Sequence, residues 1–296
     1  MTVSEGAVAV LDPPTNHANA ERWSLVLASQ GISHRIARSG AGWVLVVDPA
    51  DAARAASALG AYVTENPEPE AETTTIRPPA PGGRWLGPAF AAFIVPFHFF
   101  LVLTGRHASW IEAGAARSSH ILDGRWQRAV TALSLHADAG HVLANAFSGG
   151  FFLYWLGRTL GPGLGLALVL ASGVLGNLAN AWLRGAGHGG IGASTAVFGA
   201  VGLLAGIRAA RVARGYEPAR IGGWWLPLAA AIAVLALLGS GEQTDVMAHA
   251  TGLVAGALLG APAGLLRRAP GWAAQIAWGA AGFALIVGTW WVAGVR

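Results

Sequence analysis

Beyond residue 84 the chain consists mainly of long apolar runs separated by short polar stretches. A helix needs about 20 mostly apolar residues to cross the hydrocarbon core of a bilayer. Seven runs have that character, at 87–105, 137–157, 162–183, 194–210, 224–240, 244–266 and 272–295. Tryptophans lie at several ends of these runs, where a membrane interface favours them. The pattern therefore predicts an all-α polytopic membrane helix bundle.

Residues 1–64 show a different pattern, with short apolar runs of strand and helix character. "AVAVL" predicts a strand, and Asn16 is a candidate cap for a helix that runs to about Gln30. "HRIARSGAGWVLVV" predicts two strands joined at a glycine turn, and "PADAARAASALGAYV" predicts a second helix. We expect a small soluble α+β domain of β-α-β-β-α order. Residues 65–84, rich in Pro, Thr and Glu, predict a flexible linker.

The N-terminal domain carries no motif with recognisable chemistry. A regulatory, dimerising or substrate-recruiting module and a stabilising appendage all remain open for it.

Composition supports a membrane protein. Hydrophobic residues make up 54% of the 296 positions and charged residues 11%, against about 25% charged residues in soluble domains. The net charge of +4 suits anionic lipid surfaces, and no basic cluster with interleaved aromatics indicates nucleic acid. The absence of cysteine excludes disulfides, thiol catalysis and thiolate metal sites. We expect no metal and no cofactor.

Arginine placement predicts the orientation of the bundle, because cytoplasmic loops carry an excess of basic residues. The loops after the fourth and sixth runs contain Arg208, Arg211, Arg214, Arg220, Arg267 and Arg268. These loops, and with them the N-terminal domain, are expected in the cytoplasm. The Ala-, Gly- and Arg-rich composition suggests a bacterial cell membrane.

A few polar residues interrupt the apolar runs, where such groups are costly and face the bundle interior. His141 and Asn145 share one face of the second run, Ser194 opens the fourth, and His249 lies in the sixth. A serine and a histidine on touching helices can serve as nucleophile and general base, and two nearby donors can stabilise an oxyanion. Each residue alone is more often structural. No carboxylate lies within a run near them, so the simplest arrangement is a dyad.

Together these segments resemble the rhomboid family of intramembrane serine proteases. The resemblance rests on "GRWQR" in the first loop, "HVLAN" in the second run, "GASTAVFG" opening the fourth and "HATGLVAG" in the sixth. It implies a six-helix catalytic domain over residues 85–268, followed by an extra seventh transmembrane helix over 269–296.

The resemblance also implies residue roles. Ser194 is similar to the family's nucleophile and His249 to its general base. His141, Asn145 and the backbone N–H of Ser194 resemble the oxyanion donors. The supporting positions are Gly192, Phe198, Gly252, Gly256, Arg128 and His136. Thr195 departs from the family pattern, which usually has glycine after the nucleophile.

The resemblance implies cleavage of transmembrane protein substrates through an acyl-enzyme, in an integral multi-pass membrane protein surrounded by lipid. Two alternatives remain open. One is an inactive rhomboid-like protein that binds membrane clients, for which Thr195 is the best support. The other is a small transporter that uses His249 and the asparagines as a relay.

Overall fold

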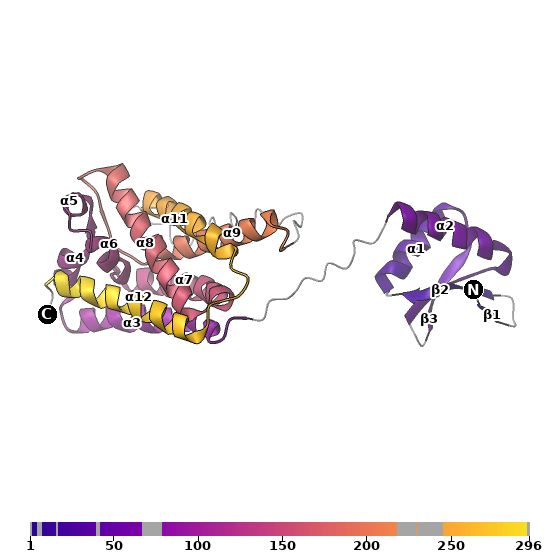
Figure 1. Cartoon of the computed structure of the whole chain (residues 1–296), viewed down its shortest axis with the longest axis horizontal. Helices are drawn as coiled ribbons and strands as arrows, with labels where there is room; N and C mark the ends of the chain where they lie inside the picture. Colours follow the sequence, from indigo (N-terminus) through magenta and orange to yellow (C-terminus); the bar gives the residue numbers. More distant parts are fainter. Residues whose placement is uncertain are drawn as a thin grey trace. The chain divides into compact units, whose positions relative to one another are not determined.

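The computed structural model describes residues 2–4, 8–15, 17–39, 42–66, 79–217, 229 and 245–294. The chain forms two compact units, Met1–Thr74 and Thr75–Arg296 (Figure 1).

The N-terminal unit is an antiparallel four-stranded sheet with two helices. Its elements are β1 (Thr2–Ser4), β2 (Val8–Thr15), α1 (His17–Ser29), β3 (His34–Ser39), β4 (Gly42–Val47) and α2 (Ala52–Glu65). The strand order is β1-β2-β4-β3, and both helices cover one face of the sheet (Figure 1). Leu27, Leu45 and Ala55 belong to the core between the layers. Asn16, the candidate helix cap, lies outside the described residues.

The second unit is a helical bundle. Its long helices are α3 (Leu86–Leu103), α7 (Ala139–Leu160), α8 (Pro162–Arg184), α9 (Ser194–Ala213), α11 (Val246–Gly264) and α12 (Trp272–Val292). The segment between α3 and α7 folds into α4 (His107–Gly114), α5 (Ser118–Leu122) and α6 (Arg128–Thr131). Its strand β5 (Ala116–Arg117) pairs with β6 (Gly189–Gly190), which lies just before α9.

Five helices in the described part of the chain are long and apolar enough to cross a membrane. They correspond to the first, third, fourth, sixth and seventh predicted runs: α3 with its preceding turn, α8, α9, α11 and α12. The second run forms α7, which has 22 residues and a length of about 33 Å, but is less apolar because it carries His141, Asn145 and Arg158. The fifth run, 224–240, lies outside the described residues apart from Ala229.

Helices α9 and α11 meet through glycine. A Cβ atom at Gly256 would lie 2.0 Å from the carbonyl oxygen of Gly199, and one at Gly202 would lie 2.0 Å from that of Leu253. No side chain fits at these distances, so the two backbones approach as small residues allow in lipid. This contact fixes how the N-terminal ends of the two helices face each other.

Helix α12 is anchored at both ends by buried polar side chains. The Gln275 Oε1 accepts hydrogen bonds from the N–H groups of Gly163 (2.8 Å) and Leu164 (3.0 Å), which open α8. Near the other end, Nε1 of Trp290 donates to Oγ of Ser134 at 3.1 Å. The seventh span is therefore part of the bundle that supports the first loop.

Candidate active site

Ser194 and His249 form a buried pair at the N-terminal ends of α9 and α11. Nε2 of His249 lies 2.9 Å from Oγ of Ser194. His249 is 4% exposed and Ser194 is 8% exposed. Gly192, with φ of +129°, turns the chain just before α9, so that Ser194 becomes the first helical residue. The distance is that of a nucleophile and its general base.

Phe198 lies one helical turn after Ser194 and stacks on His249. Its ring centroid is 4.4 Å from that of His249, with an interplanar angle of 13°. Gly252 brings α11 close at the same level, because a Cβ atom there would lie 2.2 Å from the carbonyl oxygen of Thr195. The imidazole of His249 is thereby packed against the face of α9 that carries Ser194 and Phe198.

His141 lies beside this pair, at the start of α7. Its backbone N–H donates to Oδ1 of Asp138, the helix cap, at 2.8 Å. Its ring adjoins the turn before Ser194, since a Cβ atom at Gly192 would lie 2.8 Å from Nε2 of His141 and 3.6 Å from Oγ of Ser194. His141 is therefore placed to donate toward a group bound at Ser194.

Asn145 is fully buried one turn further along α7. Its Nδ2 donates to the carbonyl oxygen of His141 at 3.0 Å, and its Oδ1 has no hydrogen-bond partner among the described residues. Asn145 thus lies next to His141 and is bonded to its own helix.

His136 is hydrogen-bonded to Ala193, the residue directly before Ser194. Its Nε2 accepts a hydrogen bond from the N–H of Ala193 at 3.3 Å, and its carbonyl oxygen contacts Nε2 of His107 at 2.8 Å. Burial, together with the neighbouring His141 and His98, lowers the pKa of His136 to about 3. The ring is therefore neutral near pH 7 and keeps the lone pair that accepts from Ala193.

Arg128 organises the first loop from a buried position in α6. Its guanidinium donates to the carbonyl oxygens of Glu112 (3.0 Å) and Ala115 (3.1 Å). These bonds hold the end of α4 next to β5. Arg128 contacts backbone that frames the site, while Trp126 of the same motif is 52% exposed.

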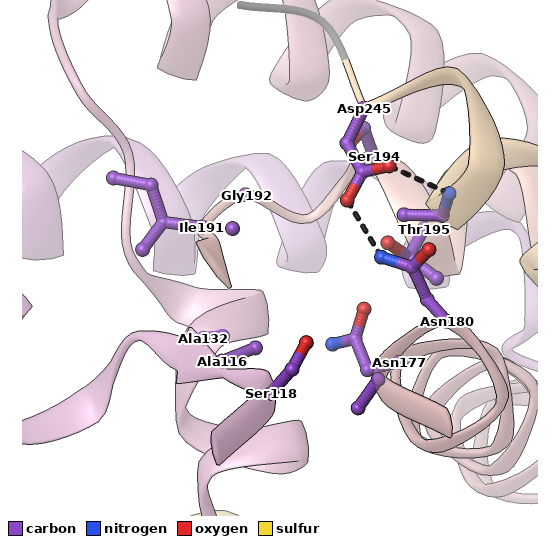
Figure 2. Close-up of a pocket in the computed structure, with 13 residues that line it drawn as sticks. Ala116, Ser118, Ala132, Asn177, Asn180, Ile191, Gly192, Ser194, Thr195 and Asp245 are labelled. Carbon is purple, nitrogen blue, oxygen red and sulfur yellow. Dashed lines mark hydrogen bonds between the residues drawn. The ribbon is translucent and has the colours of Figure 1, made fainter. Parts of the chain in front are cut away.

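The prediction that no carboxylate lies within a run near the site is wrong for Asp245, which is the second residue of the sixth predicted run, 244–266. Asp245 precedes α11 and caps it by accepting from the N–H of Ala248 at 3.0 Å. Its Oδ2 also contacts Nδ2 of Asn180 at 2.6 Å (Figure 2) and Nε2 of His188 at 2.5 Å. An aspartate directly before an apolar run is a helix-cap signal, so this part of its role was readable from sequence.

The surroundings of Asp245 keep it ionised. Burial by itself raises the pKa of this carboxyl, but hydrogen bonds from Ala248, His188 and Asn180 outweigh it and hold the pKa below its usual value. The carboxylate therefore joins α8, the segment before α9, and α11.

A small polar pocket of about 30 Å³ lies between Ser194 and Asp245. Figure 2 shows Asn177, Asn180, Ser118 and Thr195 around it. This volume holds about one water molecule. The described residues include no group of three His, Cys, Asp or Glu side chains arranged to hold a metal ion.

The fold and the site together define a multi-pass helical membrane protein with a buried serine–histidine pair at one end of the bundle. Residues 123–268 match the rhomboid domain family, so this part of the chain is a rhomboid-family domain. It is also 31% identical over 94 residues to a protein of Bacillus subtilis (strain 168) described as "Putative rhomboid protease YdcA". That alignment covers 32% of this chain and 47% of the relative, so the chain spans about half the length of this curated relative.

Proposed function

We propose that this protein is an intramembrane serine endopeptidase that works with a Ser194–His249 dyad. The observation that carries the proposal is the 2.9 Å contact between Oγ of Ser194 and Nε2 of His249, in a domain of the rhomboid family. Nδ1 of His249 has no hydrogen-bond partner in the described part of the chain, which favours a dyad over a triad.

In the proposed reaction, His249 takes the proton from Ser194 as Oγ attacks the carbonyl carbon of a substrate peptide bond. The N–H of Ser194 and the side chains of His141 and Asn145 would stabilise the oxyanion. Each such donor lowers the barrier by about 2.7–4 kcal/mol. For Asn145 this requires the amide N–H not used by the carbonyl of His141.

His249 then gives its proton to the leaving amine, and the peptide bond breaks to leave an acyl-enzyme on Ser194. Water hydrolyses the ester, with His249 again acting as base. The pocket beside Ser194, with room for about one molecule, is a suitable place from which that water enters.

The proposed substrates are single-span membrane proteins with small, helix-destabilising residues near the cleaved bond. Ser194, His249 and His141 all lie at N-terminal helix ends, opposite the arginines that end or follow the same helices. We therefore place the site near the outer leaflet of a bacterial cell membrane and the N-terminal domain, residues 1–64, in the cytoplasm. Residues 65–84 would be the linker, 85–268 the catalytic domain and 269–296 the seventh-helix segment.

The environment of Thr195 supports activity over mere client binding. Thr195 is 3% exposed, and a Cβ atom at Gly176 would lie 2.7 Å from its methyl group. The methyl group of Thr195 therefore packs against Gly176 of α8, where the absence of a side chain leaves room for it.

The test is cleavage of a model single-span substrate by the purified full chain in lipid vesicles. Ser194→Ala should abolish cleavage and also labelling by a fluorophosphonate, whereas Ser148→Ala, which removes another buried serine on α7, should retain both. Equal cleavage by Ser194→Ala and the unchanged protein would refute the dyad. Labelling without cleavage of any membrane substrate would refute the endopeptidase.

A further inference from the structure

Four arginines converge at the end of the bundle opposite the serine–histidine pair. Arg158 ends α7, Arg211 lies in the last turns of α9, and Arg267 and Arg268 follow α11. They line one cleft of about 690 Å³, here called the arginine cleft, together with Trp155, Thr159 and residues 79–81 and 269. Basic side chains far apart in the sequence are thus gathered at one place on the bundle.

Acidic side chains in the described part of the chain do not balance this charge. Glu217 contacts Arg211 at 3.3 Å, but it also contacts Arg208 at 2.8 Å. Nε of Arg211 is buried without a hydrogen-bond partner. Arg267 and Arg268 are exposed and in no ion pair among the residues described.

Arg158 is held in place by aromatic rings. Its guanidinium lies 5.5 Å from the ring of Tyr154 and 5.7 Å from that of Trp155, and it donates to the Tyr154 hydroxyl at 2.9 Å. These contacts satisfy one of its five donors. Within the described residues Tyr154 is the hydrogen-bond acceptor found for this guanidinium, which leaves four donors to meet a ligand in the cleft.

A second cavity of about 480 Å³, here called the apolar cavity, adjoins the arginine cleft. The two share Trp155, Thr159 and Arg211 as lining residues. The apolar cavity runs between α7 and α9 and is lined mainly by large apolar side chains: Phe151, Phe152, Val201, Leu204 and Ile207. A cationic cleft thus continues directly into an apolar one.

We propose that these contiguous cavities bind an anionic phospholipid, with its phosphate in the arginine cleft and an acyl chain in the apolar cavity. Guanidinium groups bind phosphate oxygens in pairs of parallel hydrogen bonds. Basic pockets between transmembrane helices bind anionic headgroups, and an apolar cavity of this kind is filled better by hydrocarbon than by water. A free phosphate would satisfy only the first cavity, so a lipid explains both.

Binding is tested by native mass spectrometry of the purified full chain titrated with phosphatidylglycerol or with phosphatidylcholine. The double variant Arg267→Gln/Arg268→Gln should bind phosphatidylglycerol about thirtyfold more weakly, because two surface arginines at about 1 kcal/mol each contribute about 2 kcal/mol to anionic-lipid binding. A charge-matched control is Arg106→Gln/Arg125→Gln, which removes two exposed arginines from the first loop. The control should bind like the unchanged protein.

A second variant tests the acyl chain. Leu204→Trp fills the apolar cavity and should weaken phosphatidylglycerol binding, but leave binding of sn-glycerol 3-phosphate and inorganic phosphate unchanged. Equal binding of the two phospholipids, or equal losses in both double variants, would overturn the proposal. Competition by inorganic phosphate at concentrations similar to those of the lipid would also overturn it, in favour of a free-phosphate site. Because binding is read as mass, the result is independent of proteolysis.

Discussion

Oγ of Ser194 lies 2.9 Å from Nε2 of His249, although 55 positions separate the two residues. The contact exists because α9 and α11 touch through Gly199, Gly252 and Gly256, where any Cβ atom would meet the other backbone or a buried side chain. The ring of Phe198 stacks on His249 and the turn at Gly192 precedes Ser194, so both side chains are positioned within that frame.

The stacking of Phe198 on His249 should contribute to rate. Phe198→Leu keeps an apolar side chain but loses the aromatic contact, which is worth about 0.5–1.5 kcal/mol. We expect the rate of fluorophosphonate labelling at Ser194 to fall about three- to tenfold. Phe198→Tyr keeps the ring and is the matched control. A leucine variant that labels as fast as the tyrosine variant would show that the ring does not position the base.

Gly256→Ala should destabilise the bundle. The new methyl group would lie 2.0 Å from the carbonyl oxygen of Gly199, and overpacking of this kind typically costs about 1–3 kcal/mol. Gly288→Ala in α12 is the control, because a Cβ atom there meets nothing within 4 Å. Thermal unfolding in detergent should show a lower Tm for Gly256→Ala than for Gly288→Ala, and equal values would contradict the close contact.

Acidification should destabilise the protein in part through His136. Its pKa is about 3 in the fold and about 6.5 in an unfolded chain. Between these pH values the unfolded state binds the extra proton, so stability falls as the pH decreases and is unaffected above that window. The contribution is about 1.4 kcal/mol for each pH unit in this range.

The variant His136→Gln removes the contribution of His136 protonation to the pH dependence of stability. It keeps the hydrogen bond, since an amide oxygen can still accept from the N–H of Ala193. The difference in unfolding free energy between the variant and the unchanged protein should shift in favour of the variant as the pH falls from 6.5 toward 3. His17→Gln, on the exposed surface of α1, should follow the unchanged protein. A constant difference across the window would refute a neutral, buried His136.

The contact between His188 and Asp245 should hold the segment before α9. In His188→Ala the hydrogen bond to Oδ2 of Asp245 is lost, and amide exchange over Gly189 and Gly190 should accelerate while the cap of α11 stays intact. In Asp245→Ala the cap is lost as well, with an additional cost of about 1 kcal/mol.

Hydrogen exchange read by mass spectrometry measures both effects. The double variant should exchange no faster at Gly189 and Gly190 than Asp245→Ala alone, because both changes remove the same bond. Unchanged exchange in His188→Ala would show that the pairing of β5 with β6 holds this segment without Asp245.

Five of the seven predicted membrane runs became membrane-capable helices, because apolar runs of that length need an internally bonded backbone in lipid. The motifs also contain the side chains that meet in the fold, Ser194 and His249 among them. Their roles in catalysis stay predictions. Asp245 was missed although it is the second residue of the sixth predicted run. Its partners His188 and Asn180 lie in the segment before α9 and in α8, and such long-range contacts are not visible in the sequence.

Sequence alone determined the membrane class and the positions of most spans. It also identified Ser194 and His249, and the glycines through which α9 and α11 approach each other. These follow from hydropathy and helical spacing, which are local properties of the chain. Only the tertiary structure decided that Gln275 and Trp290 anchor α12, that Asp245 joins three elements, and that Arg158, Arg211, Arg267 and Arg268 line one cleft. Such contacts depend on how each helix is rotated and how closely it packs, and the periodicity of a single segment does not specify either.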